Sequence, residues 1–168
     1  EAMQGNKEII DSLNTLLTAE LTAINQYYVH YKMCENWGYA KLAAKKRAES
    51  IEEMKHADEV IARILFFDAV PNMQRLNPIC VGEDPIEQHQ LDLKMELANV
   101  ERLNGFVALC REKGDNGSRE LFEQILKGEE EAVDWLEAQL GIVEKIGPER
   151  YLAEQLFEYP AAGTAPPS

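Results

Sequence analysis

The sequence is short of the features that mark secreted, disulfide-linked or membrane-spanning proteins. Its three cysteines are odd in number and widely separated, and no CxxC pair occurs, so neither a disulfide framework nor a zinc ribbon is expected. No apolar run approaches the roughly 18 residues of a membrane span, and the first residues lack the basic and apolar regions of a signal peptide. We therefore expect a cytoplasmic protein with no membrane partner.

Basic residues are also scarce. The chain of 168 residues has 17 Lys and Arg against 30 Asp and Glu, which gives a formal net charge of -13. This balance argues against a nucleic-acid partner, because phosphate contacts require Lys and Arg. It suits a protein that handles cations, although the same charge also serves simple solubility.

Proline and glycine are rare within four long stretches and gather between them, which predicts helices separated by turns. The expected helices cover residues 7–36, 39–68, 85–113 and 118–145, with a short fifth helix over 148–157. Residues 1–158 would form one domain, and the Pro- and Ala-rich tail 159–168 is predicted to be disordered. Two tight turns and one long connection predict an all-α, ferritin-like four-helix bundle with one crossover.

Each predicted bundle helix places a glutamate on its apolar stripe. These residues are Glu20, Glu53, Glu96 and Glu129, and His56 follows Glu53 by three positions. Isolated buried carboxylates are very costly, so they would be paired, protonated or bound to metal. One Glu from each of two helices, with Glu-x-x-His from the other two, is the di-iron carboxylate arrangement. The alternative is that these glutamates lie on ordinary solvated faces.

The di-iron pattern is incomplete on the fourth helix. There Glu129 is followed three positions later by Ala132, where the second histidine belongs. Glu130 and Glu131 point about 100° and 200° away from Glu129 and cannot take its place without local unwinding. Two interpretations stay open: a subunit that works with an altered second iron site, and a subunit whose di-iron chemistry is impaired.

Several segments closely resemble bacterioferritins: AELTAINQY at 19–27, NWG at 36–38, ESIEEMKHAD at 49–58 and DWLE at 134–137. The resemblance implies a 24-subunit shell of two-fold dimers that oxidises Fe(II) and stores a ferric mineral. It assigns Glu20, Glu53 and His56 to one iron and Glu96 and Glu129 to the other, with Glu53 and Glu129 bridging. Tyr27 resembles a tyrosine that the family uses beside the di-iron centre.

Met54 follows Glu53 directly and therefore points about 100° away from the bundle interior. A methionine there often serves as flexible filler in a subunit contact. In bacterioferritins the matching residue ligates the iron of a b-type haem shared with the two-fold partner, and Leu21, Asn25 and Tyr28 would line that pocket. The resemblance also implies a ferredoxin-type reductant. If the subunit is impaired, we expect a second bacterioferritin subunit as its partner in a mixed shell. We expect His30 and His89 at the surface or lining a channel.

Overall fold

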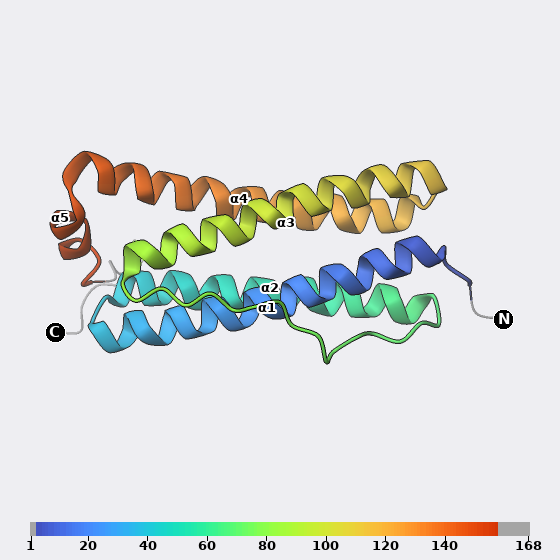
Figure 1. The fold of residues 1–168 in the computed structure, drawn as a ribbon, viewed down its shortest axis with the longest axis horizontal. Helices are drawn as coiled ribbons and strands as arrows, with labels where there is room; N and C mark the ends of the chain where they lie inside the picture. Colours follow the sequence, from blue (N-terminus) through green and yellow to red (C-terminus); the bar gives the residue numbers. More distant parts are fainter. Residues whose placement is uncertain (1–2, 158–168) are drawn as a thin grey trace, which may run out of the picture.

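The computed structural model describes residues 3–157, so the predicted disorder of residues 159–168 lies outside the described part of the chain. Five helices follow one another in it: α1 (Lys7–Trp37), α2 (Ala40–Phe66), α3 (Pro85–Lys113), α4 (Asn116–Ile146) and α5 (Pro148–Ala153). Figure 1 shows α1 beside α2 and α3 beside α4, with α5 folded across one end. The predicted all-α bundle with one long crossover is confirmed.

The helix ends follow from local chemistry. The side chain of Asn6 accepts hydrogen bonds from the first amides of α1, and Asp84 does the same for α3, where Pro85 occupies the first turn. Gly38 ends α1 with φ of 87°, a left-handed conformation that glycine adopts without strain. The fourth helix begins at Asn116 rather than 118, because Asp115 caps it, and α5 ends at Ala153 rather than 157.

The crossover between α2 and α3 lies along α1 (Figure 1). Polar side chains from one face of α1 accept hydrogen bonds from the backbone amides of the crossover. The four bonds are Asn72 N to Asn14 Oδ1 at 2.7 Å, Asn77 N to Thr22 Oγ1 at 2.9 Å, Cys80 N to Gln26 Oε1 at 3.1 Å and Gly82 N to His30 Nε2 at 3.0 Å. They hold the long connection against the bundle, although this connection contains no helix or strand.

The apolar core is divided into two parts. A large cluster around Leu13, Val60 and Leu103 fills the half of the bundle that contains the α3–α4 turn. A small cluster of Cys34, Leu42, Ala43 and Tyr151 fills the other end, beneath α5. Between them, on each of α1 to α4, lies a buried polar layer that includes the stripe glutamates. Within residues 3–157, no helix has the length and apolar character that a membrane span requires.

Candidate metal centre

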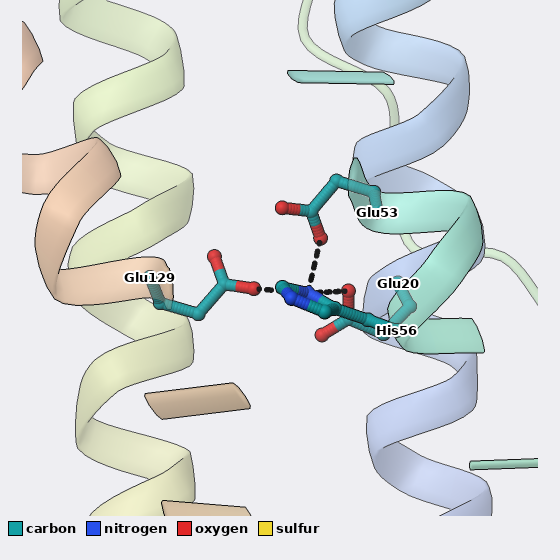
Figure 2. Close-up of side chains that lie close together, drawn as sticks. All are labelled: Glu20, Glu53, His56 and Glu129. Carbon is teal, nitrogen blue, oxygen red and sulfur yellow. Dashed lines mark hydrogen bonds and ion pairs between the residues drawn. The ribbon is translucent and has the colours of Figure 1, made fainter. Parts of the chain in front are cut away.

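Four of the predicted ligands converge on one point inside the bundle. Glu20 comes from α1, Glu53 and His56 come from α2, and Glu129 comes from α4. In Figure 2, Glu129 reaches the imidazole from one side, and Glu20 and Glu53 approach it from the other. One ligand atom of each residue lies within 4.8 Å of the corresponding atoms of the other three. This spacing is compact enough for a single cation to contact all four.

The imidazole of His56 is the centre of this cluster. Its Nδ1 lies 3.2 Å from Glu129 Oε1, 3.4 Å from Glu20 Oε2 and 3.7 Å from Glu53 Oε2. Burial alone would lower the pKa of His56, but the surrounding carboxylates raise it above its usual value. In the absence of a cation, a proton on His56 therefore compensates part of the negative charge.

The carboxylates are buried without enough polar partners. Glu20, Glu53 and Glu129 are at most 1% exposed. Both oxygens of Glu20, and one oxygen each of Glu53, Glu96 and Glu129, have no hydrogen-bond partner among residues 3–157. Burial, reinforced by neighbouring carboxylates, raises the pKa of Glu20 and of Glu53. Such groups are costly unless a cation satisfies them, and carboxylates with an imidazole suit iron, zinc or cobalt.

Glu96 lies beside the cluster but makes a different contact. Its Oε1 accepts a hydrogen bond of 2.7 Å from the hydroxyl of Tyr27, and both residues are buried. Burial and the nearby Glu96 raise the pKa of Tyr27 well above its ordinary value, so the phenol keeps its proton and remains a donor. The structure therefore places Tyr27 and Glu96 together, next to the four converging ligands.

Ala132 and Gly128 flank Glu129 on α4. Ala132 is 5% exposed and offers only a methyl group where the di-iron pattern requires a histidine. A Cβ atom built on Gly128 would lie 3.2 Å from Cε1 and 3.3 Å from Nε2 of His56. The ring of His56 thus packs directly against the backbone of α4 at Gly128. Glu130 and Glu131 are exposed, so neither compensates for the missing histidine.

The family model of the ferritin-like domain matches residues 10–146. A bacterioferritin of Mycolicibacterium paratuberculosis is 46% identical over 159 residues, which cover 95% of this chain and all of that protein. A bacterioferritin of Mycobacterium tuberculosis is 47% identical over 152 residues, or 90% of this chain and 96% of its own length. This chain belongs to the bacterioferritin family.

Similarity of the same extent is found outside the mycobacteria. A bacterioferritin of Rhodobacter capsulatus is 44% identical over 149 residues, which cover 89% of this chain and 92% of that protein. The matched range of the family model, residues 10–146, includes nearly all of the four-helix bundle. The predicted resemblance to bacterioferritins is therefore confirmed.

Three of the four residues that the bacterioferritin resemblance assigns to haem are exposed, and Leu21 packs against the edge of the large core cluster. Met54 is 48% exposed and Tyr28 is 54% exposed, although both side chains are large and largely apolar. Leu21 is partly buried, and the amide of Asn25 donates a 2.7 Å hydrogen bond to the Leu21 carbonyl. An exposed methionine and an exposed tyrosine, one on each of two paired helices, fit a contact with a partner or ligand.

His30 and His89 are not at the surface, and that expectation was wrong. Both are fully buried and belong to a polar network around Asp92. Asp92 Oδ1 accepts hydrogen bonds of 2.9 Å from Gln26 and from His30 Nδ1, because Nε2 of His30 already accepts one from Gly82 N. The ring orientation of His30 thereby links α1, α3 and the crossover.

Lys46 extends the same network toward α5. Its ammonium group is fully buried, 2.6 Å from Asp92 Oδ2 and 2.9 Å from His89 Nδ1. Because Nδ1 of His89 accepts from Lys46, Nε2 carries the proton and donates to the hydroxyl of Tyr151 at 2.8 Å. Tyr151 in turn donates to Gln139 Oε1 at 2.8 Å. This network joins all five helices, and sequence reasoning did not predict it.

Proposed function

We propose that this chain is an iron-storage subunit that oxidises Fe(II) with oxygen inside the bundle. The ferric product would be stored as mineral in a hollow, cytoplasmic shell of 24 subunits. The convergence of Glu20, Glu53, His56 and Glu129, with carboxylate oxygens that no other group satisfies, carries this proposal. Membership of the bacterioferritin family supports iron as the metal.

The residues of the cluster have distinct parts in this proposal. The three carboxylates and His56 hold Fe(II), and the buried position excludes bulk water from it. Fe(II) supplies the electrons that reduce oxygen. Tyr27 holds Glu96 beside these ligands through its 2.7 Å hydrogen bond to Oε1, and Oε2 of Glu96 has no hydrogen-bond partner among residues 3–157.

Haem binding at the two-fold axis is the second part of the proposal. Met54 of each subunit would ligate one side of a shared b-type haem, and Leu21, Asn25 and Tyr28 would line the pocket. The half-exposed position of Met54 on α2 supports this assignment. Thioether ligation raises the potential of a haem and suits electron transfer, here from a ferredoxin-type reductant during iron release.

Ala132 favours a second candidate function. A subunit without the second histidine would contribute a haem and a shell wall but oxidise iron slowly. It would then act in iron storage and release, in a mixed shell with a second, fully competent bacterioferritin subunit. The observation that favours this candidate is the buried methyl group of Ala132, which cannot ligate iron.

Aerobic iron loading of the assembled protein tests the proposal. Fe(II) is added in small increments, and ferric iron that co-elutes with the protein shell is measured. Glu53→Gln should slow the initial uptake, whereas Glu52→Gln, which changes the exposed neighbouring residue on α2, should not. Equal uptake by the wild type and Glu53→Gln would contradict a role for this site. Equal impairment by both variants would show a general effect of charge.

A further inference from the structure

The four converging ligands form one metal position. The second position of the di-iron pattern is incomplete. His56 Nδ1 and one oxygen each of Glu20, Glu53 and Glu129 form a single compact group. In particular, Glu129 Oε1 lies only 3.2 Å from His56 Nδ1, so this carboxylate is directed at the same point as the other three ligands. Four donors of this kind are a complete ligand set for one divalent transition-metal ion.

The neighbouring position has too few donors for a second ion. Glu96 lies outside the compact group; its Oε1 is bonded to Tyr27, so it has only the single free oxygen Oε2 to offer. Ala132 contributes no ligand atom, and the exposed Glu130 and Glu131 point away. No other group of three His, Cys or carboxylate ligands forms in the part of the chain that the structure describes. These residues do not fit a second iron.

His56 cannot serve both positions. Its ring packs against Gly128: a Cβ added there would lie 3.2 Å from Cε1 and 3.3 Å from Nε2 of the ring. Gly128 lies four residues before Ala132, which is about 6 Å along the axis of α4. Because the imidazole of His56 is held at the height of Gly128 along α4, no nitrogen ligand is present at the height of Ala132.

We infer that each subunit binds one divalent transition-metal ion inside the bundle, between Glu20, Glu53, His56 and Glu129. Glu96 stays with Tyr27 and contributes no second tight position. This inference rests on the proposed function in that it assumes metal enters the cluster, and it adds the number of ions. It also gives Glu129 a different part from the bridging one that the family resemblance implies: here it completes the ligands of one ion.

Cobalt(II) titration of the assembled protein tests the inference without any turnover. Co(II) is not oxidised under these conditions, and its visible absorption reports coordination by the protein. The wild type should take up one tightly bound Co(II) per subunit at this site. Ala132→His should bind two, a twofold rise, because it restores the missing nitrogen. Ala138→His adds a histidine to an exposed position of the same helix and should leave the number at one.

A cobalt-soaked crystal of the wild type provides a test that needs no variant. Anomalous scattering should give a single intra-bundle peak, surrounded by the four converging residues. Two peaks of similar height, or two tight equivalents in titration, would overturn the inference and leave the proposed function intact. One equivalent in Ala132→His would also overturn it, because histidine at 132 would not be the missing ligand. No bound cobalt would contradict both the inference and the metal site itself.

Discussion

Lys46 and Asp92 form a fully buried ion pair in which Nζ and Oδ2 are 2.6 Å apart. Burial alone would raise the pKa of Asp92, but Lys46 and the hydrogen bond from His30 hold it well below its usual range. Asp92 also accepts a bond from Gln26, so the carboxylate has partners on both oxygens. The pair thus connects α2 to α3 beside the metal cluster.

Asp92→Asn should strongly destabilise the protein, because it leaves the Lys46 ammonium buried without its counter-ion. Removal of one partner of a buried pair typically costs about 3–5 kcal/mol. The midpoint of urea unfolding at neutral pH measures the loss. The double variant Lys46→Met with Asp92→Asn should recover much of it, since it removes both charges. An unchanged midpoint in the single variant would show that the pair contributes little.

His89 should make folding stability depend on pH. Burial and the adjacent Lys46 lower its pKa to about 2, whereas the carboxylate of Asp92 opposes this shift. In the unfolded chain His89 takes up a proton below about pH 6.5. Its contribution is therefore complete above that pH and is lost as the pH falls, with a slope approaching about 1.4 kcal/mol per pH unit.

The matched variant for this prediction is His89→Gln. Its side-chain oxygen can accept from Lys46 and its amide can donate to Tyr151, but it does not titrate. Unfolding free energies of the two proteins at several pH values between 5 and 7 isolate the effect, because all other titrating groups are shared. The curve of the wild type should fall more steeply toward low pH. Parallel curves would contradict the assignment.

The bundle and the four converging residues of the candidate site could be predicted because they follow from local periodicity. Apolar residues at intervals of three and four fix which face of a helix is buried, and Glu53 and Glu129 interrupt those faces visibly. Glu-x-x-His on one helix then brings His56 to the same side as Glu53. These inferences require no knowledge of which helices are neighbours.

The polar network was missed because its pairing joins distant parts of the chain. Lys46 lies on the same helix stripe as Leu42 and Glu53. From the sequence alone, it is only a charged residue that interrupts this apolar stripe. Its burial is tolerable because Asp92 reaches it from α3, 46 positions along the chain. The spacing on α3 nevertheless indicated a buried carboxylate: Asp92 precedes Glu96 by four residues, one turn along the same face of the helix.

Met54→Leu should abolish haem binding and leave the shell assembled. Leucine has a similar volume and hydrophobicity but no thioether sulfur to ligate iron. The haem Soret absorbance per subunit, together with gel filtration, measures both properties. Met73→Leu is the control, because Met73 is similarly exposed at 52% but lies in the crossover. Retained haem in Met54→Leu would contradict the proposed ligand.

Oxidation of Fe(II) by the wild type should be slow, and Ala132→His should accelerate it. The buried alanine leaves the second position without a nitrogen ligand. Loss of only an outer-shell partner of a metal ligand costs about 10–100-fold in activity, so we expect the restored ligand to raise the rate by at least that much. Stopped-flow absorbance after mixing with two Fe(II) per subunit and oxygen measures the rate. A fast phase in the wild type that consumes both ions would exclude the impaired-subunit function.

Gly128→Ala should weaken metal binding while the fold remains stable. The new methyl group would lie 3.2 Å from His56, so the ring must shift by a few tenths of an ångström and away from its carboxylate partners. Alanine within a helix is favoured over glycine by about 1 kcal/mol, which offsets the crowding in the free energy of unfolding. Gly141→Ala receives the same helical benefit in α4, but a Cβ there meets nothing within 4 Å. A lower Co(II) affinity in Gly128→Ala alone would show that His56 is positioned by the backbone of α4, whereas equal affinities in both variants would mean that the ring adjusts freely.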